Sequence, residues 1–171
     1  MKPLFIVDID GTVCDSAAAF RQASHIPVDD WGDAELGMFF REFAIHCGVV
    51  PGAGILPGLL ASGKCDVVFL TGRSERIGRT RIGLTVTRAW LGKVFGMPKY
   101  VPLLMRPHRD DRPTHEVKHG VFRKEVLPSF RRRLFVFLDD DPDVLKLYSK
   151  HGIALKAPEC WAALSHMATI Q

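Results

Sequence analysis

Two groups of acidic side chains in this 171-residue sequence each come directly after a short, strand-like apolar run. Asp8 and Asp10 come after LFIV, and the run Asp139–Asp141 comes directly after LFVFL. So many carboxylates can gather in a partly buried site only if cations offset their repulsion. Carboxylate oxygens suit Mg²⁺, which normally shares its site with a phosphate. The two acidic groups therefore predict a magnesium site that handles a phosphate.

A third polar group, TGRS, follows the apolar run VVFL and begins with Thr71. The hydroxyl and backbone N–H of Thr71 suit phosphate oxygens, and a lysine nearby would complete the charge balance. A DxD pair alone is a weak signal, because an acid in a loop usually caps a helix or faces solvent. Three polar groups, each after an apolar run, are a much stronger indication.

The stretch HEVKH, His115 to His119, suggests a different chemistry, since it matches the HExxH motif of zinc metallopeptidases. Two histidines four residues apart share a helix face, and Glu116 would serve as general base to a zinc-bound water. However, Lys118 within the motif disfavours a dication nearby, and no downstream Glu helix offers a third ligand. Zinc is therefore the weaker interpretation, and the two histidines are expected on the surface or at a substrate rim.

The spacing of the apolar runs predicts the elements that position these groups. Runs rich in Val, Ile, Leu and Phe alternate with helical patterns, which indicates a parallel sheet with helices on both faces. Ligands of such sheets bind beyond the carboxyl ends of the strands, where the polar groups fall. The predicted strands are 4–7, 67–70, 101–105, 134–138 and 153–155. One helix is predicted to start at residue 16, and the other predicted helices are 34–46, 52–63, 76–94, 113–127, 144–151 and 161–167.

The composition is that of one globular domain. Hydrophobic residues make up 47% of the chain and charged residues 25%, and no apolar run is long enough to span a membrane. The first residues do not form a signal peptide, and the four scattered cysteines are expected to be reduced thiols. We therefore predict a cytoplasmic protein without a membrane partner, and the sequence leaves its oligomeric state open.

The basic residues are clustered, and the net charge is +4. Basic surface favours polyanionic partners such as nucleic acid, although solvated helix faces and loop ends are the ordinary explanation. Arginines close to the predicted strand ends would favour the first interpretation. The clusters span 73–81, 106–112 and 131–133.

Taken together, DIDGTV, FLTGR, a lone lysine and FLDDDPD resemble the four motifs of the haloacid dehalogenase-like phosphohydrolases, over nearly the whole chain. This resemblance implies a single domain, 1–171, with a Rossmann-like α/β fold and a small helical cap insert at about 16–50. It implies that Asp8 is the nucleophile that forms an aspartyl-phosphate, and that Asp10 is first the general acid and then the base.

The same resemblance assigns the remaining groups of the site. Thr71, Gly72 and Lys118 would hold the phosphate. The Mg²⁺ ion would be bound by Asp8, the Asp10 carbonyl and Asp139, with Asp140 in support. A carboxylate can attack a dianionic phosphate only if the metal and the lysine screen the charge.

A narrower resemblance is carried by LLMRPHRDDRPTHEVK and by the helix ending in TRAWLGKVFGMP. These stretches are similar to the phosphatase domain of phage-type polynucleotide kinase-phosphatases, which remove 3′-phosphates from nucleic-acid ends. Thr114 departs from that pattern, which usually has Asp there, and the chain has no GxxxxGK[ST] motif of a kinase half. Arginines near the predicted strand ends would contact the substrate, namely Arg73, Arg106, Arg109 and Arg112.

Three functions remain open at this point. The first is a Mg²⁺-dependent phosphomonoesterase acting on 3′-phosphate ends of DNA or RNA, and the second is a nucleoside monophosphate phosphatase. The third, which the complete set of motif residues disfavours, is a non-catalytic nucleic-acid-binding module. The short insert would leave the site open to a polymer end or a nucleotide. Phe39, Phe40 and Phe43 could stack on bases, with core packing as the ordinary alternative.

Overall fold

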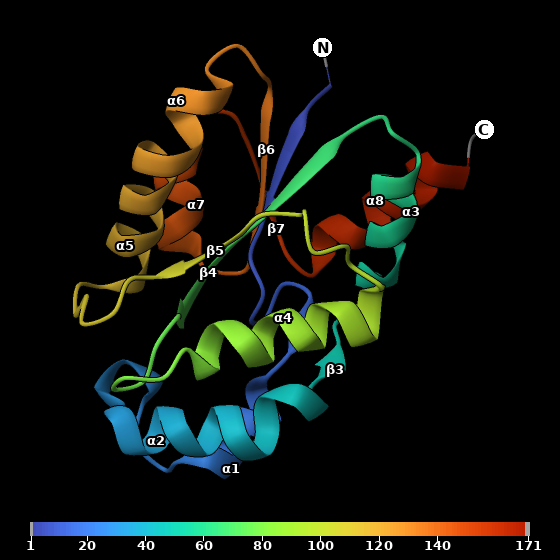
Figure 1. Ribbon diagram of the computed structural model, residues 1–171. Coiled ribbons are helices and arrows are strands. Elements are labelled where there is room, and N and C mark those ends of the chain that lie inside the picture. Colours follow the sequence, from blue (N-terminus) through green and yellow to red (C-terminus); the bar gives the residue numbers. More distant parts are fainter. Residues whose placement is uncertain (1, 170–171) are drawn as a thin grey trace.

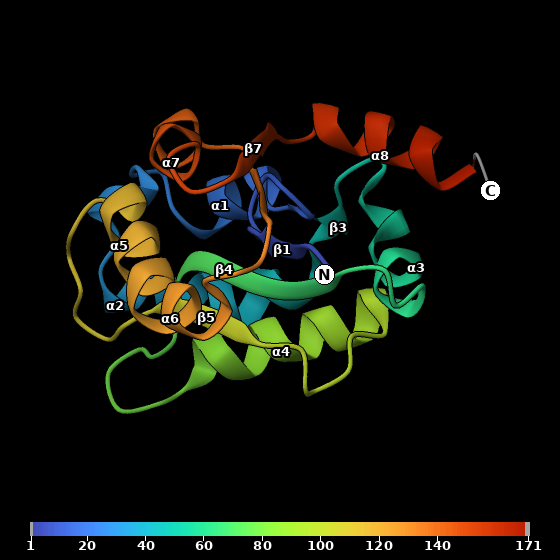
Figure 2. The same ribbon diagram turned by 90° about the horizontal axis from the view of Figure 1, so that it is seen from above.

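The computed structural model describes residues 2–169, which form a five-stranded parallel sheet with helices on both faces (Figures 1 and 2). The strand order is β5-β4-β1-β6-β7. The predicted α/β fold with a parallel sheet is confirmed. The strands are β1 (Leu4–Val7), β4 (Asp66–Ser74), β5 (Leu103–Arg106), β6 (Phe135–Asp139) and β7 (Ile153–Lys156).

The central strand β1 brings the polar groups of the sequence together. Val7, its last residue, pairs with Phe69 of β4 on one side and with Leu138 of β6 on the other. Since all three strands run in the same direction, the residues that follow these positions lie at one edge of the sheet. The register therefore places Asp8, Thr71 and Asp139 side by side.

Alternate residues of β1 face two separate apolar cores, as a strand buried on both faces requires. Phe5 and Val7 belong to the core beneath helices α3 (Leu56–Ala61), α4 (Ile82–Phe95) and α8 (Glu159–Thr169). Leu4 and Ile6 belong to the core on the other face. That face is covered by α5 (Thr114–Val121), a π-helical turn (Phe122–Val126), α6 (Leu127–Phe130) and α7 (Pro142–Tyr148).

A helical segment, residues 16–50, forms a separate layer that packs against α4 (Figure 1). The short antiparallel pair β2 (Cys14–Asp15) and β3 (Gly48–Val49) holds its two ends together. Its own small core joins apolar side chains of the segment to Ile82 and Val86 of α4. In order it contains α1 (Ala17–Ala23), η1 (Val28–Asp30), α2 (Asp33–Met38), the π-helical turn Phe39–Phe43 and η3 (Ala44–His46).

Two predicted boundaries differ most from the structure. Strand β4 continues through TGRS to Ser74, because Ser74 still pairs with Arg106 of β5. Helix α4 begins at Ile82 and not at 76, because residues 75–81 form a loop with reciprocal backbone hydrogen bonds between Ile77 and Thr80. Among the described residues, no helix is long and apolar enough to cross a membrane.

Candidate active site

The carboxylate of Asp8 lies at the floor of the site, directly after β1. Its backbone N–H donates to the Leu138 carbonyl at 2.9 Å and so continues the parallel ladder for one residue. The Thr12 hydroxyl donates to Asp8 Oδ2 at 3.3 Å. Gly11 has φ +72°, a left-handed conformation that lets the chain turn back immediately beyond the strand. The Asp8 side chain is thereby fixed at the carboxyl edge of the sheet.

Lys118 of α5 bridges the ends of β1 and β6. Its Nζ lies 2.8 Å from Asp8 Oδ1 and 2.9 Å from Asp139 Oδ2, and each of the three side chains is at most 3% exposed. Burial raises the pKa of Asp8 to about 7, against the lowering effect of Lys118. Burial alone would lower the pKa of Lys118, but the two carboxylates outweigh it and raise that pKa above its ordinary value. The lysine is therefore charged at neutral pH and offsets the buried acids.

Carboxylate oxygens from three residues converge beside this lysine. Ligand atoms of Asp8, Asp139 and Asp140 lie within 4.8 Å of one another. Burial and the Asp8 charge raise the pKa of Asp140 to about 6. A Cβ at Gly11 would collide with the Asp140 carboxylate, so only glycine allows this approach. The donor set is all oxygen, which fits Mg²⁺ and not a soft metal.

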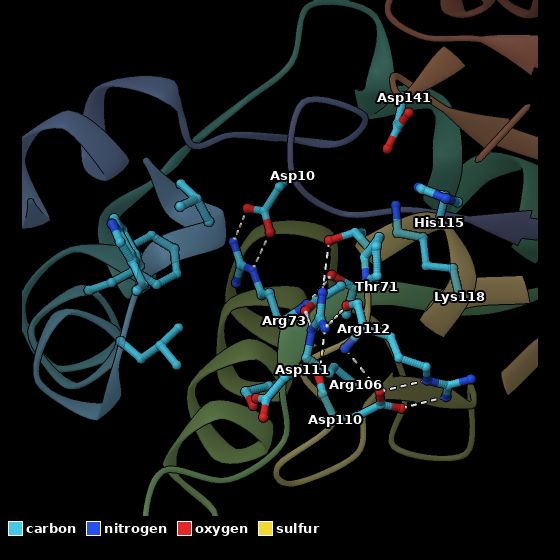
Figure 3. Close-up of a pocket in the computed structure, with 18 of the residues that line it drawn as sticks. Asp10, Thr71, Arg73, Arg106, Asp110, Asp111, Arg112, His115, Lys118 and Asp141 are labelled. Atoms are coloured by element: carbon cyan, nitrogen blue, oxygen red, sulfur yellow. Dashed lines mark hydrogen bonds and ion pairs between the residues drawn. The ribbon is translucent and has the colours of Figure 1, made fainter. Parts of the chain in front are cut away.

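Arg73 holds the carboxylate of Asp10 with two hydrogen bonds (Figure 3). Its Nε lies 2.8 Å from Asp10 Oδ2 and its Nη2 lies 2.6 Å from Asp10 Oδ1. The arginine is 5% exposed. It also donates to the Thr87 hydroxyl and to Cys14 Sγ, each at 3.3 Å, and its guanidinium stacks 5.3 Å from the Phe39 ring centroid. These contacts direct Arg73 toward positioning Asp10 rather than toward flanking phosphates.

Gly72 and Thr114 meet where β4 passes the start of α5. A Cβ on Gly72 would come within 2.7 Å of Thr114 Cγ2. Arg106 ties both together, since its Nε donates to the Gly72 carbonyl at 3.0 Å and its Nη2 to the Thr114 hydroxyl at 2.8 Å. Thr71 is buried beside them, and its hydroxyl accepts from the Arg73 N–H at 3.2 Å. Thr114 thus serves here as an anchor for Arg106.

The loop between β5 and α5 is held by the same arginine. Arg106 Nη1 donates to the carbonyls of Asp110 and Arg112, at 2.7 Å each. Arg112 in turn forms a two-point ion pair with Asp110 (Figure 3). Arg109 differs from both: it is exposed, has φ +61°, and makes no hydrogen bond or ion pair within residues 2–169. Arg109 is therefore the loop arginine whose guanidinium is not already engaged by a carboxylate or carbonyl of the described residues.

These groups line one cavity of about 840 Å³, between the helical segment and the β5–α5 loop. Asp8, Asp10, Thr71 and Lys118 all face it, as does Asp140. The structure therefore brings the predicted catalytic, phosphate-binding and metal-binding residues into one site.

Of the three phenylalanines considered for base stacking, Phe43 packs against the core of the helical segment and the other two belong to it. Phe39 and Phe40 are each 1% exposed and form the core of the helical segment. Core packing, the ordinary alternative, therefore accounts for both rings.

The histidines of HEVKH do not form a metal site. His115 faces the cavity, but His119 points away and its Nε2 lies 3.0 Å from His151 Nε2. Among the described residues, the only group of three or more potential metal ligands is the carboxylate cluster of Asp8, Asp139 and Asp140. Of the two expected locations, the surface or a substrate rim, His115 lies at the cavity, and His119 is partly exposed beside His151, a partner that no local sequence signal indicated.

Residues 56–157 match the family model described as the polynucleotide kinase PNKP phosphatase domain. The chain belongs to this phosphatase family. The match includes FLTGR, Lys118 and the acids after β6, and it agrees with the resemblance found in the sequence. The protein is therefore an enzyme, a phosphatase of the haloacid dehalogenase-like type.

Solved structures with the same fold include two of a Pnkp1/Rnl/Hen1 complex, one of which is described as an RNA repair complex. They are 17% identical to this phosphatase, cover 91% of it and have TM-scores of 0.63 and 0.64. The phosphatase spans only 45% and 42% of those chains. CbbY from Rhodobacter sphaeroides, in complex with phosphate, is 14% identical with a TM-score of 0.60, over 92% of this chain and 87% of its own. No curated protein sequence matches the chain.

Replacing Lys118 by methionine should destabilise this phosphatase in a pH-dependent way. The variant leaves Asp8 and Asp139 buried without their cation, which costs about 3–5 kcal/mol of unfolding free energy. The pKa of both carboxyls rises further in the folded state, whereas the unfolded chain keeps the ordinary value. The loss of unfolding free energy relative to the parent protein should therefore grow from pH 5 to pH 8, as measured by urea unfolding with a chelator present.

Lys124→Met is the matched control, because Lys124 lies on the same stretch of helix with its side chain 83% exposed. It should change the unfolding free energy by less than about 0.5 kcal/mol. If Lys118→Met lowers the unfolding free energy equally at all pH values, Lys118 does not act by offsetting the charges of Asp8 and Asp139.

Proposed function

We propose that this phosphatase is a Mg²⁺-dependent phosphomonoesterase that removes 3′-phosphates from polynucleotide ends through an aspartyl-phosphate. The observation that carries the chemistry is the position of Asp8, a buried carboxylate with Lys118 at 2.8 Å and the fixed Asp10 in the same cavity. A lysine there neutralises charge on both the nucleophile and the incoming phosphate. The helical segment 16–50 would act as a small cap over this single domain.

In the first step Asp8 attacks phosphorus, and the bond between phosphorus and the sugar oxygen breaks. Asp10 donates its proton to the leaving oxygen. In the second step Asp10 takes a proton from water, the water oxygen attacks phosphorus, and the acyl-phosphate bond breaks to restore Asp8 and release phosphate. Arg73 keeps the Asp10 carboxyl in place for both transfers.

The same arrangement supports the remaining roles. Thr71 and the backbone at Gly72 would hold phosphoryl oxygens together with Lys118. Asp8, Asp139 and Asp140 would hold Mg²⁺, with the Asp10 carbonyl. Bound there, Mg²⁺ supplies positive charge that offsets the carboxylates and the phosphoryl oxygens.

The substrate proposal rests on the shape and charge of the cavity. It is wide enough for more than a phosphate, at about 840 Å³, and Arg76 and Arg109 lie on its exposed rim. Basic groups around a phosphate site favour a ligand with flanking phosphates. The description of the matched family names a polynucleotide kinase, and one structural neighbour belongs to an RNA repair complex. A role in nucleic-acid repair, in the cytoplasm, belongs to the same proposal.

Asp8→Asn should abolish hydrolysis and leave the fold intact. An amide cannot form the acyl-phosphate, so kcat should fall by at least about 10³-fold, measured by phosphate release with circular dichroism as the fold check. Asp30→Asn makes the same chemical change at an exposed position outside the cavity and should stay within about twofold of the parent. If the kcat of Asp8→Asn stays within tenfold of the parent value, Asp8 is not the nucleophile.

Mg²⁺ should raise the melting temperature more at pH 8 than at pH 5. Protons compete with the metal for Asp8 and Asp140, whose pKa values are raised to about 7 and about 6. At 100 times its Kd, Mg²⁺ should stabilise the protein by about 2.7 kcal/mol. The Asp139→Asn, Asp140→Asn double variant should lose the stabilisation by Mg²⁺, whereas the His115→Ala, His119→Ala double variant should keep it. If Mg²⁺ still raises the melting temperature of the Asp139→Asn, Asp140→Asn variant, the assignment of these residues as metal ligands is wrong.

Arg109→Ala should raise KM for a 3′-phosphorylated oligonucleotide and leave kcat nearly unchanged. The guanidinium would contact a flanking phosphate equally in the ground and transition states, so its loss removes uniform binding. The slope of log KM against log salt should fall by about 1. Arg132→Ala is the control, since Arg132 is exposed just before β6, at the opposite edge of the sheet.

The same assay distinguishes the nucleotidase alternative. A free 3′-mononucleotide has no flanking phosphate, so its hydrolysis should respond weakly to salt and to Arg109→Ala. If free mononucleotides are cleaved as efficiently as oligonucleotide ends with a matching salt response, the nucleotidase function replaces the polynucleotide one.

A further inference from the structure

One wall of the cavity is apolar, and the proposed chemistry does not use it. It belongs to the helical segment 16–50 and consists of Phe20, Val28, Trp31 and Leu36. Val28 is 45% exposed, and Trp31 and Leu36 are partly exposed. Apolar side chains left open inside a charged cavity indicate contact with an apolar part of the ligand.

Trp31 is held rigidly in this wall. Its indole Nε1 donates to the Ile26 carbonyl at 3.1 Å. Its ring meets Phe20 edge-on, with centroids 5.6 Å apart and planes at 82°, and it lies 5.9 Å from Phe39. Phe39 in turn is buried beneath the Arg73 guanidinium. The indole therefore occupies a fixed position relative to Arg73 and Asp10, which favours binding because little side-chain entropy remains to be lost.

The opposite wall has the complementary character. It is formed by the β5–α5 loop, where Arg109 is exposed and His108 also faces the cavity. The floor between the two walls holds Asp8 and Lys118. A ligand that fills this cavity thus meets the floor with Asp8 and Lys118, the exposed guanidinium of Arg109 on the loop, and an apolar wall. A phosphorylated nucleotide with its flanking phosphate has the same three parts.

We propose that the apolar wall, with Trp31 at its centre, is a subsite for the nucleobase of the terminal nucleotide. This inference rests on the proposed function and adds to it the part of the substrate recognised beyond the phosphate. The Trp31 N–H is already used by Ile26, so the indole offers the base a stacking surface and no hydrogen bond. The subsite should accept all bases, because each presents a π-face.

The test compares two oligonucleotides that carry the same 3′-phosphate, one ending in a normal nucleotide and one in an abasic tetrahydrofuran residue. Trp31→Ala should lower kcat/KM for the base-bearing end by about 5- to 100-fold, mainly through KM, since stacking on an aromatic ring contributes that range. The abasic end should change by less than about twofold. Trp31→Phe keeps an aromatic face and should restore most of the loss.

Met38→Ala is the matched control. Met38 is an apolar residue of the same segment, 45% exposed, and it does not line the cavity. It should leave both substrates unaffected, and thermal melts should confirm that all the variants are folded.

Fluorescence gives a readout independent of turnover. Of the three tryptophans, Trp90 and Trp161 are fully buried, so quenching by a stacked base should report on Trp31. With the Asp8→Asn variant, the base-bearing oligonucleotide should quench the emission and the abasic one should not.

The outcomes separate the two proposals. An equal loss with both oligonucleotides in Trp31→Ala, or no loss with either, would overturn the base subsite and leave the polynucleotide function standing. Hydrolysis of free 3′-mononucleotides in place of ends would overturn the polynucleotide function. In that case, Trp31→Ala should lower kcat/KM for the mononucleotide but not for an abasic sugar phosphate. Such a result would still support the base subsite.

Discussion

The site depends on one buried cation, the ammonium group of Lys118 between Asp8 and Asp139. Parallel strands β1 and β6 deliver both carboxylates to adjacent positions, where two unpaired buried charges would repel and resist desolvation. Helix α5 supplies the compensating charge, and its own packing on β4 and β5 places the lysine there. The same lysine that makes these acids compatible with folding would also make Asp8, the proposed nucleophile, compatible with an anionic substrate.

Arg73 extends this arrangement to the helical segment. It comes from the end of β4, binds Asp10 from the loop after β1, contacts Thr87 of α4 and stacks on Phe39. A single buried guanidinium therefore links Asp10, the proposed proton-transfer group, to the sheet and to the segment that closes one side of the cavity. Displacement of the segment would move Phe39 away from Arg73 and disturb the support of Asp10.

The strands and the positions of the polar groups were predictable, because apolar runs and the residues that follow them are local features of the sequence. Lys118 was found through a family motif, since nothing local distinguishes it from other helical lysines. The partner of Arg73 was not predicted, because Asp10 and Arg73 are 63 residues apart and meet only through the strand order. The roles of Arg106 in anchoring the loop and of His151 beside His119 are likewise products of tertiary packing.

Burial divides the cavity into two parts with different physical character. Asp8 and Lys118 at the floor, and Asp139 behind them in contact with Lys118, are almost fully buried, and they lie at the ends of β1 and β6 and on helix α5. The walls come from connecting segments, in which Trp31 and Arg109 remain open to a ligand. Rigid, desolvated groups suit a chemical step that tolerates little displacement, whereas exposed loops tolerate change in sequence. The sheet thus positions the groups proposed for the phosphoryl chemistry, and the recognition that we propose for the group bearing the phosphate involves residues 16–50 and the β5–α5 loop.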